Sequence, residues 1–78
     1  MNAKDIKRDH ERLLENLRLI QTNFTAAALA EALGISRATW TNRMREPWRQ
    51  FSYDDFKSIA RFCKIDFVQL VDGHLSIK

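Results

Sequence analysis

The sequence is poor in residues that cross-link, break or bend a chain: its 78 residues include one cysteine, one proline and two glycines. The single cysteine, Cys63, excludes a disulfide within the chain, and two glycines make a glycine-rich nucleotide loop implausible. No apolar run approaches the roughly 20 residues of a membrane-spanning helix, and no secretory signal pattern opens the chain. We therefore expect a soluble, cytoplasmic protein without a membrane partner.

Side chains that bind metals or catalyse reactions are equally scarce. His10 and His74 are the only histidines, and both lie far from Cys63 in the sequence. None of the ligand spacings typical of tetrahedral zinc sites occurs. No nucleophile with a plausible base and no pair of carboxylates stands out as a candidate for catalysis. The sequence thus predicts a protein that is not an enzyme and that needs neither a metal nor another cofactor.

Positive charge is concentrated in one stretch of the chain. The net charge is +3, although residues 1–35 and 50–78 each hold equal numbers of acidic and basic side chains. The whole excess lies in residues 36–49, where Glu46 faces four arginines: Arg37, Arg43, Arg45 and Arg49. One electropositive patch on an otherwise balanced molecule favours a negatively charged partner.

Helix signals cover most of the chain, which we interpret as one all-α domain (residues 1–78) with a short tail at residues 73–78. One local pattern recurs, in which a capping residue is preceded by an apolar residue and followed, four positions later, by another. Its four instances, each marking a helix start, are Phe24-Thr25-Leu29, Ile35-Ser36-Trp40, Phe51-Ser52-Phe56 and Ile65-Asp66-Leu70. Apolar residues at three- and four-residue steps indicate a longer helix before them.

Helix ends complete this prediction. Gly34 suits a helix C-terminus, and Pro47 disfavours helical geometry at Glu46. Only residues 34–36 separate the second helix from the third, so the two must turn sharply and cross at a large angle, which the small Ala30 permits. This arrangement is a helix-turn-helix with glycine in the turn. The sequence thus predicts five helices, at residues 3–22, 26–33, 37–45, 53–63 and 67–72.

The stretch TAAALAEALGISRATWTNRMREP resembles the helix-turn-helix of the lambda-repressor and Cro-like superfamily. The resemblance rests on Leu29-Ala30, Leu33-Gly34, Ile35-Ser36 and Trp40, which fall at the characteristic offsets. More narrowly, SRATW, the following Arg43-Met44 and Pro47, and the helix SYDDFKSIARFCKID are similar to short phage-type repressor domains, from about residue 10 to residue 72. The resemblance implies a five-helix, lambda-repressor-like DNA-binding domain with its helix-turn-helix at helices two and three.

The same resemblance implies which residues contact base edges in the major groove: Arg37, Ala38 and Asn42, with Thr41 as a flanking candidate. Their chemistry suits that role. Arginine can grip guanine with two hydrogen bonds, asparagine can do the same to adenine, and an alanine methyl can meet a thymine methyl. On a helical wheel, Trp40 and Met44 define the inner side of this helix, whereas Ala38, Asn42 and Arg45 face outward.

Other residues are expected to contact phosphates, which supply affinity and register without reading sequence. We assign this role to Arg43, Arg45 and Arg49, and to Asn23 and Thr25 at the start of the second helix. The sequence departs from the family at Ala26, where a glutamine is common. Trp48 leaves two interpretations open, because it can either pack on the helix at residues 53–63 or donate its indole N–H to a phosphate.

Two further features concern packing. Cys63 shares a helix face with Phe56, Ile59 and Ala60, which predicts a buried, unreactive thiol. An apolar set near the C-terminus either completes the core or forms a homodimer interface, which is attractive because the family pairs two recognition helices on half-sites roughly 34 Å apart. This set consists of Phe62, Phe67, Val71, Leu75 and Ile77.

Two hypotheses of function follow. The first is a sequence-specific, double-stranded DNA-binding transcriptional regulator of the phage or prophage Cro/repressor type. The second keeps the same fold but makes it a protein-interaction adaptor, such as an antirepressor, an antitoxin-like partner or a phage assembly factor, because a fold does not decide a function.

Overall fold

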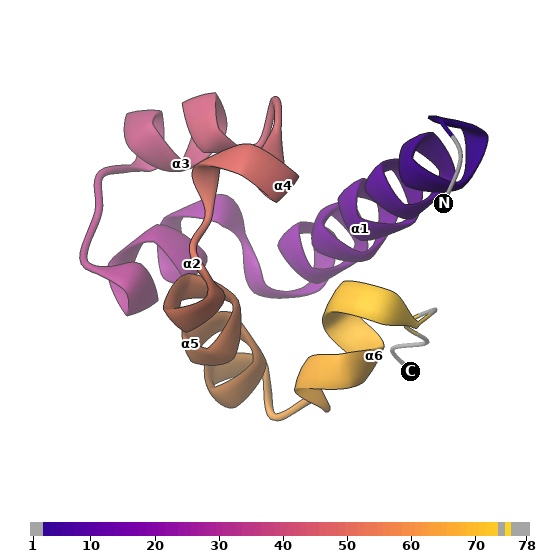
Figure 1. The fold of residues 1–78 in the computed structure, drawn as a ribbon. Helices are drawn as coiled ribbons and strands as arrows, with labels where there is room; N and C mark the ends of the chain where they lie inside the picture. The colour runs from indigo at the N-terminus through magenta and orange to yellow at the C-terminus, as the bar shows by residue number, and fades with distance from the viewer. Residues whose placement is uncertain (1–2, 74, 76–78) are drawn as a thin grey trace.

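The computed structural model of the protein describes residues 3–73 and residue 75, and every regular element in this part of the chain is a helix. Figure 1 shows these helices packed around a common centre. All-α architecture is therefore confirmed. In chain order the helices are α1 (Ala3–Phe24), α2 (Ala26–Leu33), α3 (Arg37–Arg43), α4 (Pro47–Gln50), α5 (Tyr53–Cys63) and α6 (Phe67–Asp72).

The four predicted helix starts are confirmed at the level of single hydrogen bonds. Each capping side chain accepts a hydrogen bond from a backbone N–H in the first turn of its helix, satisfying a donor that the helix leaves free. The caps are Thr25 for α2, Ser36 for α3, Ser52 for α5 and Asp66 for α6. At Ser52 the device is reciprocal, since the Asp55 carboxylate accepts from the Ser52 backbone N–H.

The segment after α3 differs from the prediction of five helices. α3 ends at Arg43 instead of residue 45, and a short additional helix, α4, begins at Pro47. Glu46 does leave helical geometry, with φ −139° and ψ 67°. However, proline also suits the first position of a new helix, because its φ is already helical and its missing N–H is not needed there. Pro47 therefore both ends the helical geometry before it and begins α4.

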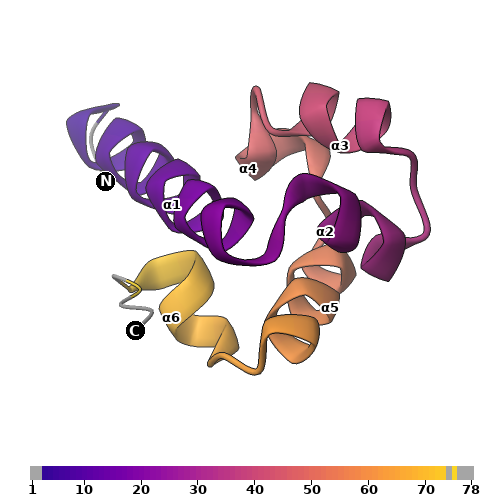
Figure 2. The same ribbon diagram turned by 180° about the vertical axis from the view of Figure 1, so that it is seen from behind.

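The helices pack around a single core, and α1 is the longest of them. α1 contacts α2, α4 and α6, while α5 packs against α2 and α6, and α3 packs against α2. Figures 1 and 2 show α6 alongside α1, with α3 and α4 on the opposite side of the molecule from α6. The largest fully buried side chains come from α1, α2, α3, α4, α5 and α6: Leu17, Ile20, Leu29, Trp40, Pro47, Ile59 and Leu70.

The predicted C-terminal apolar set is divided between core and surface. Phe67, Val71 and Leu75 are partly buried and pack against the core. Phe62 is 42% exposed and meets Phe24 with ring centroids 6.0 Å apart. Ile77, the last member of the set, lies outside the described residues. Among the described members of this set, Phe62 therefore has the most surface to offer a partner.

Cys63 is buried, as predicted. Burial raises the pKa of its thiol from 9.0 to about 11, because removing a group from water disfavours its charged form. The thiolate is the nucleophilic form of cysteine, so the side chain is unreactive at neutral pH.

Candidate functional site

Helix α3 is anchored to the molecule by Trp40. This side chain is fully buried, and its ring meets that of Phe51 at a centroid distance of 5.3 Å. Its indole N–H donates to the side-chain oxygen of Gln21 on α1 at 2.7 Å. Met44, four residues further on, is partly buried against the core. One side of α3 is thereby fixed against α1 and the residues before α5, which leaves the other side to solvent.

All four side chains that were assigned to base edges are accessible to solvent. Arg37, Ala38, Thr41 and Asn42 are exposed, as is Arg45 just beyond the end of the helix. The exposure of Ala38 and Asn42 follows from the 3.6-residue period once Trp40 is turned inward, whereas Arg37 lies nearer the side of Met44 and is exposed at the first turn of the helix. Among the described residues, no ion pair involves Arg37 or Arg45. Within the described part of the chain, the exposed surface of α3 thus carries two guanidinium groups without an ion pair, beside small and polar side chains.

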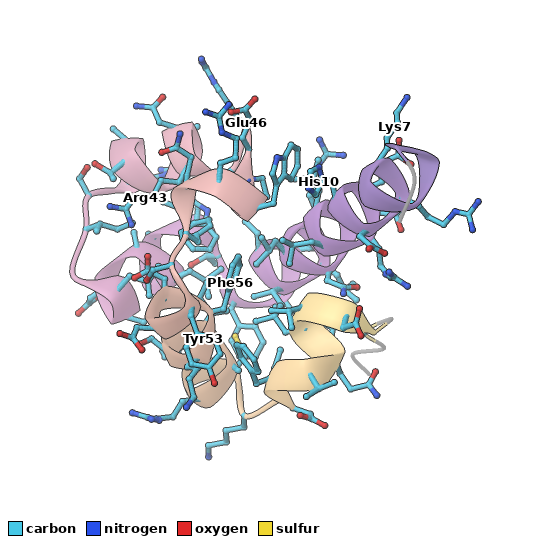
Figure 3. All side chains as sticks on the ribbon, in the orientation of Figure 1. Lys7, His10, Arg43, Glu46, Tyr53 and Phe56 are labelled. Atoms are coloured by element: carbon cyan, nitrogen blue, oxygen red, sulfur yellow. The ribbon has the colours of Figure 1, made fainter. Side chains whose placement is uncertain are left out.

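The remaining arginines of the basic stretch are paired. Arg43 is partly buried between α3 and α5, where its guanidinium lies 3.5 Å from the Asp55 carboxylate and 5.9 Å from the centre of the Phe51 ring. Arg49 lies 3.3 Å from the carboxylate of Glu46, and both side chains are largely exposed. Figure 3 labels Arg43 and Glu46 on different sides of this region. Two of the four arginines are thus held in ion pairs with acidic side chains.

Asn23 and Thr25 lie where α1 passes into α2, and both are exposed. The Asn23 amide donates to the Leu19 carbonyl at 2.8 Å, and the Thr25 hydroxyl accepts from the Ala28 N–H at 3.2 Å. Thr25 has a φ of 69°, an unusual value for a β-branched residue. Both side chains already serve local hydrogen bonds, so what this corner offers a ligand is the first backbone N–H groups of α2.

Trp48 makes a contact that neither interpretation of the sequence included. Its ring stacks on His10 of α1, with ring centroids 4.2 Å apart and an interplanar angle of 5°. Figure 3 shows His10 on the side of α1 that faces α4. The stack ties α4 to α1 and covers one face of the indole. Trp48 is also partly buried against the core, so its packing includes α1.

A hollow of about 360 Å³ lies between α1 and α3, beside the start of α2. Three arginines border it, namely Arg18 from α1 with Arg37 and Arg45, and no acidic side chain does. The other lining residues are Leu14, Gln21, Ala26, Thr41 and Met44. Arg37, Thr41 and Arg45 therefore share this hollow, whereas Ala38, Asn42, Arg43, Trp48 and Arg49 do not line it.

Sequence reasoning missed Arg18. It lies in a segment whose formal charges cancel, so its charge was counted as part of a balanced surface. The structure brings it to the same hollow as Arg37 and Arg45, 19 or more residues further along the chain. Only the packing of α1 beside the helix-turn-helix segment creates this neighbourhood. The local signal, a basic residue one turn before Gln21, was too weak to reveal it.

The described part of the chain has neither a metal-binding cluster nor a membrane-spanning helix. Within residues 3–73 and 75, no three histidine, cysteine or acidic side chains come together in a way that could hold a metal ion. None of the helices described is both long enough and apolar enough to cross a membrane.

Comparison with known proteins adds no further constraint, because no family model, curated protein or solved structure matches the chain.

Proposed function

We propose that the protein is a sequence-specific, double-stranded DNA-binding transcriptional regulator of the short phage-repressor type, acting in the cytoplasm. In this proposal α2, the turn at residues 34–36 and α3 form a DNA-binding helix-turn-helix. The observation that carries the proposal is the two-sidedness of α3. Trp40 is fully buried, while the residues assigned to base edges are exposed, and neither Arg37 nor Arg45 forms an ion pair with any described residue.

Each exposed side chain of α3 has a matching partner in the major groove. Arg37 would donate two hydrogen bonds to a guanine, and Asn42 would make a bidentate contact with an adenine. The Ala38 methyl would meet a thymine methyl, and Thr41 would contact a flanking base. A helix of this length can place its first turn and a half at the floor of the groove, which is wide enough to admit an α-helix.

The strength that we expect of each phosphate contact depends on whether the arginine already forms an ion pair. Arg45 is exposed and without an ion pair among the described residues, so it would contribute most. Arg49 would exchange the exposed partner Glu46 for a phosphate, because an exposed ion pair contributes little. Arg43 is tied to Asp55, so we assign it the weakest contact of the three.

The other assigned phosphate contacts come from polar N–H groups. Asn23 and Thr25 frame the first backbone N–H groups of α2, which can donate to a phosphate at the helix N-terminus. Trp48 would use its indole N–H, because His10 already covers one face of its ring. These contacts would set the register of the protein on the duplex without reading bases.

Binding measurements with a duplex selected from a random pool test this proposal. We expect Arg37→Ala to cost about 1–3 kcal/mol on the selected duplex and much less on random duplexes, because it removes a base contact. Arg45→Ala should weaken both duplexes similarly and reduce the slope of log affinity against log salt by about one, because it removes a phosphate contact. Fluorescence anisotropy at several salt concentrations measures both effects.

Arg61→Ala is a matched control, since Arg61 is an exposed arginine on α5, away from α3. It should leave the discrimination between the two duplexes unchanged. If Arg37→Ala and Arg45→Ala both bind as well as the unaltered protein, α3 does not dock as proposed. If no duplex is bound in a salt-sensitive manner, the adaptor hypothesis is favoured instead.

A further inference from the structure

The hollow between α1 and α3 has a lining that can donate hydrogen bonds but hardly accept them. Guanidinium groups donate only, and three of the lining residues are arginines. Leu14, Ala26 and Met44 supply the apolar part of the lining. Thr41 has the one hydroxyl, which can donate as readily as accept.

Gln21 strengthens this one-sided character. An indole N–H can only donate, so its bond to Gln21 fixes the amide with its oxygen toward Trp40. The amide nitrogen, with two N–H donors, is therefore the free end of a side chain that lines the hollow. Because Trp40 is fully buried, its indole is fixed in place, and the bond holds the Gln21 amide in this orientation. The lining thus combines three cations with an oriented neutral donor.

The charges of the hollow are uncompensated within the described residues. None of the three ion pairs there involves Arg18, Arg37 or Arg45. Three guanidinium groups around one concavity repel one another, and an anion would relieve that repulsion. Arginine also matches phosphate oxygens through two parallel hydrogen bonds. The acceptor that fits is therefore compact, rich in oxygen and multiply charged.

We propose that this hollow binds a small phosphate-bearing anion, with two or more phosphate groups, between Arg18 on one side and Arg37 and Arg45 on the other. The volume of about 360 Å³ is in the range of small-molecule sites, and the apolar lining leaves room for an organic part of the ligand. Arg18 distinguishes this site from the outer side of α3, because it belongs to α1 and is not among the residues assigned to DNA.

A regulatory consequence rests on the proposed function. Arg37, Thr41 and Arg45 border the hollow and are also assigned to the DNA interface. A bound anion would neutralise Arg37 and Arg45, so it would compete with the duplex for the same charges. The protein would then release its DNA target when the phosphorylated small molecule accumulates.

Calorimetric titration of the full chain with inorganic pyrophosphate, without DNA and at constant ionic strength, tests the site itself. We expect one pyrophosphate per chain, and binding at least about tenfold weaker for Arg18→Ala, a difference of about 1.4 kcal/mol. Arg61→Ala, which removes an exposed arginine elsewhere, should bind as the unaltered protein does. Arg18 is exposed, so its replacement is not expected to unfold the chain, and circular dichroism checks this.

The outcomes separate the site from the DNA function. Absence of pyrophosphate binding, or equal weakening by Arg18→Ala and Arg61→Ala, overturns the proposed site. If pyrophosphate does not bind but Arg18→Ala weakens the duplex, the hollow holds a backbone phosphate of DNA and the small-ligand proposal is wrong. If pyrophosphate binds and no duplex does, the site stands and the DNA function fails. If both bind, pyrophosphate should lower duplex affinity in the unaltered protein and less so in Arg18→Ala.

Discussion

At the scale of single residues, the polar side chain of Asn16 connects α1 to the end of α6. It is the only polar or charged side chain buried in the core of the described chain. Its amide nitrogen donates to the carbonyls of Leu70 at 2.9 Å and Gly73 at 2.8 Å, and its oxygen accepts from the Leu75 N–H at 3.2 Å. One side chain on α1 thus satisfies backbone groups where α6 ends, and the sequence gives no local sign of this role.

Removing the Asn16 side chain should therefore destabilise the fold. We expect Asn16→Ala to lower the free energy of unfolding by about 2–3 kcal/mol, because buried backbone groups lose their partners and a cavity remains. Urea denaturation measures this value. Asn23→Ala is the control, since Asn23 is exposed and bonds only within α1, and it should change stability by less than about 0.5 kcal/mol. Equal effects of the two substitutions would contradict the structural role of Asn16.

The buried thiol of Cys63 should make stability depend on pH in alkaline solution. Burial raises its pKa to about 11, so between about pH 9 and about pH 11 the unfolded chain loses this proton first. The folded state then binds more protons than the unfolded state, and stability falls as pH rises through this window. The loss is up to about 3 kcal/mol, since the shift is about two pKa units and each unit corresponds to about 1.4 kcal/mol.

Comparison with Cys63→Ala isolates this effect from lysine and tyrosine titration, which both proteins share. The free energy of unfolding, measured by denaturant at several alkaline pH values, should fall more steeply in the unaltered protein. Parallel pH profiles would show that the folded state does not hold the thiol in its protonated form.

At the scale of elements, two helices end in the same left-handed conformation with different residues. Gly34 ends α2 with φ 71°, and Lys64 ends α5 with φ 57°. In both cases the following isoleucine, Ile35 or Ile65, donates its backbone N–H to a carbonyl five residues earlier, at 3.0 Å. This geometry is common at helix ends and favours glycine, since a Cβ there crowds the backbone. Lys64 therefore carries a strain that Gly34 avoids.

Exchanging the residue types at these two ends should shift stability in opposite directions. Lys64→Gly should stabilise the fold by about 0.5–1 kcal/mol, because the relieved strain exceeds the added entropy of the unfolded chain. Gly34→Ala should destabilise it by about 1–2 kcal/mol. A methyl at Gly34 meets no atom within 4 Å, so this cost comes from the backbone alone. Thermal and urea denaturation measure both; a neutral Lys64→Gly would mean that the lysine is not strained.

The elements also show which parts of the structure can be predicted from sequence. Caps and end glycines act over one turn, so Thr25, Ser36 and Gly34 marked their helix boundaries directly. Pro47 was ambiguous, because the same ring stops one helix and starts another. The stack of Trp48 on His10 and the approach of Arg18 to α3 depend on contacts between distant segments. The buried and exposed sides of α3 were therefore predictable, whereas the hollow was not.

At the scale of the whole molecule, size limits how many base pairs one chain could contact under the proposed function. The described chain measures 36 × 27 × 20 Å, and α3 alone would span only a few base pairs. Two copies placed end to end along the longest dimension would have centres about 36 Å apart, which is close to the roughly 34 Å between half-sites on one face of DNA. Within the proposed function, a homodimer is thus compatible with the size of the chain, and the set around Phe62 is its candidate interface.

A charge at Phe62 should separate dimerisation from folding. Phe62 is 42% exposed, so Phe62→Glu leaves the core in place but makes an apolar interface carry two buried carboxylates. We expect the unaltered protein to sediment on its selected duplex as two chains of 9.2 kDa each, and Phe62→Glu to bind as one chain with lower affinity. Ala32→Glu is the control, because Ala32 is exposed on α2 and lies outside the predicted set. If Phe62→Glu still binds as a pair, the two copies meet through another surface, and the partly buried Phe67, Val71 and Leu75 serve the core alone.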